Sequence, residues 1–95
     1  MKVLTAIMQA VPGKGDAVER EFKKLIPKVL KDPGAVIYIV NRAMDDPDKF
    51  LVYEQYENEE AFKYHVQTEH YQVFRQATKT MFIGKTAVTF YRKVA

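Results

Sequence analysis

The order in which strand-like and helix-like apolar patterns follow one another constrains the fold of this chain most. Apolar residues recur in strand-like stretches rich in Val, Ile and Tyr over residues 3–11, 35–42, 50–56 and 86–94. Helical spacing predicts one helix capped by Asp16 and a second from Asn58 to about Lys79, with a break near Thr68. This βαββαβ order predicts an α+β, ferredoxin-like sandwich, in which two helices cover one face of an antiparallel sheet.

The predicted strands are apolar on both faces. A sheet with one face in water alternates apolar and polar residues, but here both sets contain large apolar side chains. The first strand has Val3, Ile7 and Val11 on one face and Leu4, Ala6 and Met8 on the other. The third has Phe50, Val52 and Tyr56 opposite Leu51 and Tyr53. Two helices cover only one face, so we expect a second copy of the chain to cover the other, giving a homodimer.

Length and composition exclude several classes of protein. The chain has 95 residues, which suits a single domain spanning residues 1–95. Cysteine is absent, which excludes disulfides and thiolate chemistry. No apolar run approaches the roughly 20 residues of a membrane span. The run from Val3 to Val11 is interrupted by Thr5 and Gln9, which argues against a signal peptide. We expect a cytoplasmic protein with no membrane partner.

Nucleic-acid binding is also not expected. The net charge is only +3, and charges of both signs are interspersed along the chain. RNA-recognition domains share the βαββαβ order, and their third strand carries a basic residue, a glycine and aromatics. The third strand here lacks the glycine and places Glu54 near its middle, where a carboxylate would repel phosphate.

The strongest candidate for chemistry is the pair formed by Glu54 and His65. Glu54 shares a strand face with Val52 and Tyr56, and His65 shares a helix face with Phe62. If both faces point inward, the carboxylate would orient the imidazole and raise its pKa, as it does for a general base. The competing interpretation is a structural pair with no catalytic task.

A metal site is not expected at the two histidines. His70 follows His65 by five residues, about 140° further round an ideal helix, so the two do not share one face. No third ligand is obvious. We expect His70 to cap or pack at the break near Thr68.

Aromatic residues gather around the same segment. They include Tyr56, Tyr71, Phe74 and Phe82. Such residues often form an ordinary core, but they can also line an apolar pocket for a flat organic ligand.

Five stretches that span most of the chain carry a family resemblance. They are residues 12–14 (Pro-Gly-Lys), 32–34 (Asp-Pro-Gly), 46–47 (Asp-Pro), 53–62 and 65–71. In order and spacing they resemble the antibiotic biosynthesis monooxygenase (ABM) domain family. The resemblance implies a ferredoxin-like fold and a dimeric α+β barrel. The family includes monooxygenases of polycyclic aromatics, quinol monooxygenases, haem-degrading enzymes and an enzyme that acts on a processed signalling sugar.

Differences between this chain and the family pattern reduce the number of family activities that the resemblance implies for it. Tyr56 stands where the family often has Trp. The haem-degrading branch uses an Asn–Trp–His triad, but the corresponding positions here are Ala6, His65 and Arg75. The chain is therefore most similar to the small quinol-monooxygenase-like members.

This resemblance implies a monooxygenase that needs no cofactor and lets a small aromatic phenol or quinol react with molecular oxygen. It implies His65 as the base, backed by Glu54. The implied pocket wall consists of Tyr56, Tyr71, Phe74 and Phe82. Two alternatives stay open: an isomerase or lyase of a small carbonyl metabolite, with His65 moving protons without oxygen, and a dimeric small-ligand-binding domain without catalysis.

Overall fold

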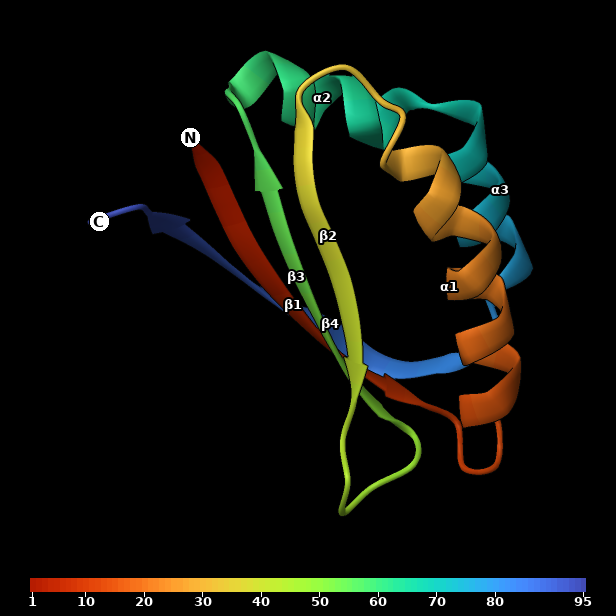
Figure 1. Cartoon of the computed structure of the whole chain (residues 1–95). Coiled ribbons are helices and arrows are strands. Elements are labelled where there is room, and N and C mark those ends of the chain that lie inside the picture. Colours follow the sequence, from red (N-terminus) through yellow and green to blue (C-terminus); the bar gives the residue numbers. More distant parts are fainter.

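All three helices lie on one face of a single four-stranded antiparallel sheet (Figure 1). The computed structural model describes residues 1–95. Its elements are β1 (Lys2–Ala10), α1 (Gly15–Val29), β2 (Ala35–Arg42), β3 (Lys49–Tyr56), α2 (Glu59–Gln67), α3 (Glu69–Ala77) and β4 (Phe82–Arg92). The strand order is β2-β3-β1-β4, and neighbouring strands are antiparallel. The predicted α+β, ferredoxin-like fold is confirmed. None of the helices has the length and hydrophobicity that a membrane span requires.

The predicted second helix is two helices, α2 and α3, which meet at Thr68 as the sequence indicates. Thr68 has extended backbone angles (φ −67°, ψ 152°), ends α2 and caps α3. Its hydroxyl donates to the carbonyl of His65 at 2.8 Å and accepts from the amide of Tyr71 at 3.2 Å. Asn58 caps α2, with its side-chain oxygen accepting from the amide of Ala61 at 2.9 Å, as predicted.

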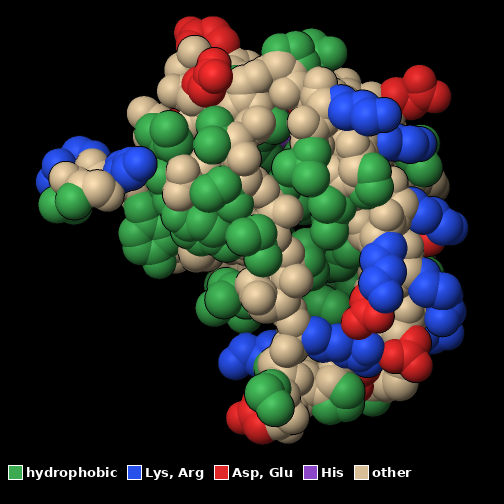
Figure 2. All heavy atoms as spheres, viewed as in Figure 1, with side chains coloured by type: hydrophobic (Ala, Val, Ile, Leu, Met, Phe, Trp, Pro, Cys, Tyr) green, Lys and Arg blue, Asp and Glu red, His purple; other side chains and the backbone are tan.

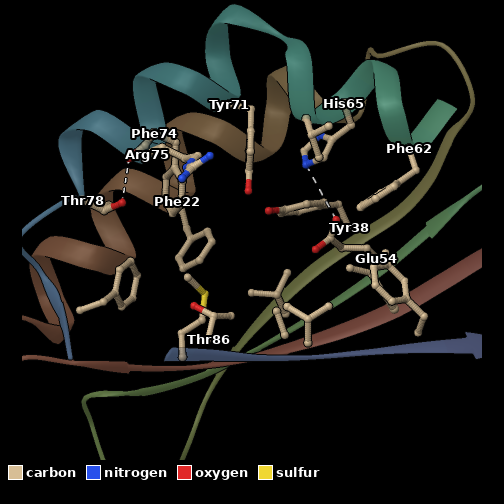
Figure 3. A pocket seen from close by; sticks show the side chains of 18 of the residues that line it. Phe22, Tyr38, Glu54, Phe62, His65, Tyr71, Phe74, Arg75, Thr78 and Thr86 are labelled. Atoms are coloured by element: carbon tan, nitrogen blue, oxygen red, sulfur yellow. Dashed lines mark hydrogen bonds and ion pairs between the residues drawn. The ribbon is translucent and has the colours of Figure 1, made fainter. Parts of the chain in front are cut away.

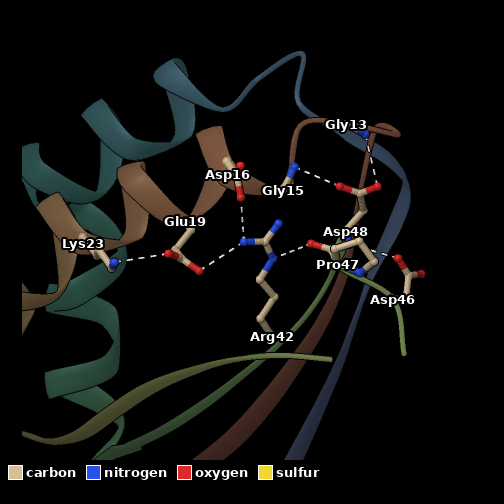
Figure 4. A network of polar contacts seen from close by, with 9 residues as sticks. All are labelled: Gly13, Gly15, Asp16, Glu19, Lys23, Arg42, Asp46, Pro47 and Asp48. Carbon is tan, nitrogen blue, oxygen red and sulfur yellow. Dashed lines mark hydrogen bonds and ion pairs between the residues drawn. The ribbon is translucent and has the colours of Figure 1, made fainter. Parts of the chain in front are cut away.

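The cap predicted for α1 is wrong. The helix begins at Gly15, and Asp16 lies in its first turn, where it accepts a hydrogen bond from Arg42 at 2.9 Å. The carboxylate of Asp48 instead accepts from the amides of Gly13 at 3.1 Å and Gly15 at 2.9 Å (Figure 4). Asp48 lies in the β2–β3 loop, so only the tertiary structure brings it to this helix end.

The last strand is displaced from its predicted range of residues 86–94. β4 begins at Phe82, which pairs with Ala10 of β1, and ends at Arg92. Gly84 indicated a loop in the sequence, but it lies within the strand with a positive φ of 69°. A glycine accepts this angle without steric cost, and the pairing register with β1 shifts nearby.

The core lies between α1 and the helix-facing side of the sheet. Val18, Phe22, Leu25 and Val29 of α1 are buried. The Phe22 ring lies 5.9 Å from that of Phe50 in β3 and 4.6 Å from that of Phe74 in α3, centroid to centroid. These aromatic contacts fix α1 and α3 over the sheet.

The opposite face of the sheet has no helix over it. Ile7 and Leu51 pair directly across β1 and β3, and Ile39 of β2 shares their face. Each of these three side chains is between 40% and 50% exposed. Figure 2 shows hydrophobic side chains gathered over the side of the sheet away from the helices. The strands are thus apolar on both faces, as the sequence predicts.

Candidate functional site

A cavity of about 660 Å³ lies between the sheet and helices α2 and α3 (Figure 3). Its volume is in the range of small-molecule sites. Most of its lining is apolar, and Val88 and Phe90 of β4 form part of the wall. Both are about half exposed, because β4 is an edge strand. The cavity is therefore bounded on one side by the edge of the sheet.

Glu54 projects from β3 into this cavity. It shares the helix-facing side of the strand with Val52 and Tyr56, as its parity predicts, and is buried. The hydroxyl of Tyr56 donates to Oε1 of Glu54 at 2.6 Å. Burial raises the pKa of Glu54 to about 7, although the hydrogen bond from Tyr56 acts in the other direction. Near neutral pH this carboxyl group is thus close to half-protonated.

His65 projects from α2 toward Glu54 (Figure 3). Its side chain is 2% exposed, and its Nε2 lies 3.8 Å from Oε1 of Glu54, which is longer than a hydrogen bond. Its ring lies against those of Tyr38, Tyr56 and Tyr71, with centroids 5.6, 5.3 and 4.8 Å away. The structure brings the two predicted partners together and surrounds the imidazole with aromatic rings.

The direction predicted for the imidazole pKa is wrong. Burial lowers the pKa of His65 to about 4, although the charge of Asp32 acts to raise it. A nearby carboxylate alone raises the pKa of an imidazole, but at a 2% exposed ring the loss of water has the larger effect. His65 is therefore a neutral imidazole at physiological pH.

Asp32 and His70 extend this cluster in a way that the sequence analysis missed. Nε2 of His70 lies 2.9 Å from Oδ2 of Asp32, and the same oxygen lies 3.8 Å from Nδ1 of His65. His70 thus bonds to a residue in the turn after α1 instead of acting at the Thr68 break. Asp32 precedes Pro33 and Gly34 in one of the stretches that carry the family resemblance, but this pattern is typical of a turn and does not indicate a contact with the histidines.

The predicted pocket aromatics fall into two groups. Tyr71, Phe74 and Phe82 line the cavity. Tyr56 is fully buried and contacts Glu54 through its hydroxyl, so it supports the site without forming its wall. Tyr38 lines the cavity without having been predicted, and burial raises the pKa of its hydroxyl well above the ordinary value.

Two cationic side chains, Arg75 of α3 and Lys79 of the turn that follows it, also line the cavity. Arg75 forms no ion pair, and Figure 3 shows its guanidinium among the side chains of the cavity wall. Burial raises the pKa of the Tyr71 hydroxyl, whereas the positive charge of Arg75 acts to lower it. Glu54 is the one acidic residue in the lining. No group of three or more His, Cys, Asp or Glu residues is arranged to hold a metal ion.

Comparison with known proteins gives a consistent result. The family model described as antibiotic biosynthesis monooxygenase matches residues 1–77. No curated protein sequence matches the chain. Among solved structures, a Nitrosomonas europaea protein assigned to the antibiotic biosynthesis monooxygenases has a TM-score of 0.95 at 20% identity, with 100% of both chains covered. A structure described as an antibiotic biosynthesis monooxygenase has a TM-score of 0.92 at 21% identity, again over 100% of both chains. The protein PA3566 from Pseudomonas aeruginosa has a TM-score of 0.91 at 24% identity, over 99% of this chain and 94% of its own. At these identities the structures support the fold alone.

Proposed function

Because the chain belongs to the antibiotic biosynthesis monooxygenase family, we propose that it is a cofactor-independent monooxygenase of a small aromatic phenol or quinol that works as a homodimer. The observation that carries this proposal is the buried Glu54–His65 pair at one end of an aromatic-lined cavity. The volume of about 660 Å³ suits a ligand of one or a few fused rings.

Proton removal from the substrate hydroxyl is the step assigned to this pair. Neutral His65 offers a lone pair at Nε2, and the nearby Glu54 oxygen stabilises the imidazolium that forms. A charge attraction at 3.8 Å is stronger in a site with little water than in solution. The same burial favours a flat aromatic substrate over a strongly hydrated one.

The oxygen step then draws its electrons from the substrate. Loss of the proton places negative charge on the ring, and a ring carbon forms a C–O bond with molecular oxygen. Breaking the O–O bond leaves one oxygen atom on the ring and releases the other as hydroxide, which becomes water by taking up a proton equivalent to the one that the substrate lost. A quinol becomes a hydroxyquinone in this way, and a phenol becomes a quinone, so no other reductant is needed.

Arg75 and Lys79 indicate a preference within the substrate class. Both line the cavity, and a guanidinium without an ion-pair partner binds carboxylates well. We therefore expect phenols with an acidic substituent to bind better than their neutral counterparts. Arg75→Gln should raise the KM for a carboxylated phenol on the order of tenfold, as one charge-assisted hydrogen bond is lost. The KM for the uncarboxylated phenol should hardly change, and equal changes for both would contradict this role.

The homodimer is supported by the face of the sheet that no helix covers. Ile7, Ile39 and Leu51 are about half exposed there. Contiguous exposed apolar patches of this kind mark interaction sites. The helices already bury the other face, so pairing of two uncovered faces would enclose the sheets of both copies.

The enzymatic proposal is tested with benzene-1,4-diol and naphthalene-1,4-diol under ¹⁸O₂. We expect oxygen uptake above the uncatalysed background and one ¹⁸O atom in each product molecule. His65→Gln and Glu54→Gln should each lower kcat on the order of a hundredfold. Tyr64→Phe is the matched control, because Tyr64 is the exposed neighbour of His65 on α2 and should leave the rate unchanged.

Other outcomes would support the alternatives. Conversion of a small carbonyl compound that continues without oxygen would favour the isomerase or lyase. Phenols that bind in the cavity without being converted would favour the ligand-binding domain. Full activity of His65→Gln would remove His65 as the base.

A further inference from the structure

Asp32 lies between the two histidines of the chain. Its Oδ2 lies 2.9 Å from Nε2 of His70 and 3.8 Å from Nδ1 of His65. Asp32 follows α1, His65 belongs to α2 and His70 to α3. The turn after α1 thus brings one carboxylate oxygen to two imidazoles that lie five residues apart on consecutive helices.

Nδ1 of His65 is the one buried side-chain polar atom without a hydrogen-bond partner. A polar atom left unpaired away from water is costly, and each such case in a folded protein calls for a reason. Oδ2 of Asp32 is within reach, because a movement of less than about 1 Å would bring the 3.8 Å separation to hydrogen-bond length. The unpaired atom therefore points to a contact with Asp32 that forms and breaks.

The cluster runs from the cavity to the protein surface. His65 lines the large cavity, and its side chain is 2% exposed. The Asp32 side chain is 7% exposed and that of His70 is 20% exposed. His70 lines a separate small groove on the outside, between α1 and α3. The three side chains thus follow a gradient of exposure from the interior to water.

We propose that Asp32 and His70 form a proton route that carries the proton taken up by His65 to solvent. This inference rests on the proposed function, in which His65 receives the substrate proton at Nε2. The Nδ1–H bond of the imidazolium breaks as an O–H bond forms on Asp32. That O–H bond breaks as His70 accepts at Nε2. In the resting 2.9 Å contact with the Asp32 carboxylate the His70 ring proton is on Nε2, so it first moves to Nδ1 by exchange with water. His70 then loses its Nδ1 proton to water, so one proton leaves and every residue regains its charge. His65 is left with its proton on Nε2, and this proton returns to Nδ1 by exchange before the next cycle.

The difference in burial between the two imidazoles favours this direction. Besides Asp32 and His70, the titratable groups against His65 are Glu54, Tyr38, Tyr56 and Tyr71. The groove that holds His70 is also lined by Glu21, Lys24 and Lys28 of α1. Asp32 lies closer to the outer imidazole than to the inner one, and Glu21 also lines the outer groove, so the fixed charges do not favour either ring. The inner ring is 2% exposed and loses stabilisation by water when it is charged, whereas the outer ring is 20% exposed, so the proton moves outward.

A structural role is the alternative, in which the His70–Asp32 bond only ties α3 to the end of α1. The two roles predict opposite effects on proton exchange at the buried ring. Loss of a structural tie loosens the packing and speeds exchange of the His65 ring N–H with water. Loss of a proton route slows it.

The test uses ¹⁵N-histidine-labelled protein, in which only two imidazoles give signals. We expect neutral His65 to carry its proton on Nδ1 in the unaltered chain. His70→Gln should slow its exchange with water on the order of tenfold, less than the 10²–10⁴ typical of a positioned acid or base, because water can replace part of the route. Free imidazole in the buffer should restore exchange. Glu69→Gln, next to His70 on the exposed side of α3, is the control.

Asp32→Asn provides a second variant. An asparagine amide can donate to Nδ1, so we expect the His65 proton to move to Nε2. Faster exchange in His70→Gln, or a His65 proton on Nε2 in the unaltered chain, would overturn the route.

In the quinol assay, His70→Gln should lower kcat at unchanged KM, and imidazole should restore it. Absence of turnover in every variant and in the unaltered chain would refute the proposed function, whereas the exchange measurement would still decide on the route.

Discussion

Burial shifts the pKa values of Glu54 and His65, the two residues of the candidate pair, in opposite directions. Loss of water favours the neutral form of both, so the pKa of Glu54 rises to about 7 and that of His65 falls to about 4. Between these values both side chains are mostly neutral. The proposed reaction needs neutral His65 beside ionised Glu54, a combination that prevails only above about pH 7.

The first prediction concerns the pH dependence of catalysis. We expect kcat/KM to rise with pH through about 7 and then level off, because Glu54 has to lose its proton to stabilise the imidazolium. Oxygen uptake with a slowly autoxidising phenol, measured on both sides of neutrality, gives the profile. Glu54→Gln should remove the rise. A rise with the same midpoint in that variant would show that another group is responsible.

The second prediction concerns stability. Glu54 has a folded-state pKa above its ordinary 4.5, so its contribution to stability is lost as the pH rises from 4.5 to about 7. His65 has a folded-state pKa below its ordinary 6.5, so its contribution is lost as the pH falls from 6.5 to about 4. In the native chain the pH dependence of stability from Glu54 therefore opposes that from His65.

Single substitutions should separate these opposing contributions. The free energy of unfolding of Glu54→Gln should fall on acidification below 6.5, and that of His65→Gln should fall as the pH rises above 4.5. Each change should be on the order of 3 kcal/mol, given about 1.4 kcal/mol per pKa unit. Urea unfolding across this range measures it. Parallel curves for the two variants would contradict the assigned shifts.

At the scale of elements, the break at Thr68 determines which side chains meet in the cavity. In one continuous helix Tyr71 would lie about 240° round from His65 and would face away from it. The extended backbone of Thr68 ends α2 and starts α3 in a new direction. The rings of His65 and Tyr71 consequently lie 4.8 Å apart.

Thr68→Val is expected to destabilise the protein by about 1 kcal/mol, the usual effect of losing a helix N-cap. It should also lower activity, because the position of Tyr71 depends on this cap. Thr68→Ser keeps the hydroxyl and serves as the control. Thermal unfolding and oxygen uptake measure the two effects. Equal stability of both variants would show that the hydroxyl does not hold the break.

At the scale of the whole molecule, the sheet separates a face packed against helices from a face without cover. Ile7, Ile39 and Leu51 occupy the uncovered face. A stable dimer interface of standard size buries roughly 1,600 Å² in total. A four-stranded sheet with large apolar side chains offers a surface suited to that purpose.

We expect light scattering to show a dimer at micromolar concentration and Leu51→Lys to give a monomer. A lysine at the centre of an apolar interface loses its water without gaining a partner. Val73→Lys places the same charge on an exposed valine of α3, on the helix side, and should leave the dimer intact. A monomeric native chain, or equal effects of both substitutions, would refute the proposed interface.

Local patterns predicted the parts of this structure that depend on neighbouring residues. The element order, the Asn58 cap and the Thr68 break follow from periodicity and capping preferences. Strand parity placed Glu54 on the same side as His65. The Asp48 cap and the position of Asp32 depend on loops that only the tertiary fold brings together. The pKa of His65 depends on how much water the packed core excludes, which spacing does not reveal.

The central position of β1 also has a consequence for how the chain folds. Lys2 pairs with Tyr56 on one side and with Arg92 on the other, so the first strand finds both partners late in the sequence. Contacts between distant residues slow folding, because long loops have to close before any pairing is gained. During synthesis β1 therefore stays without partners until β3 is complete, and the four-stranded sheet is completed only once β4 has been made.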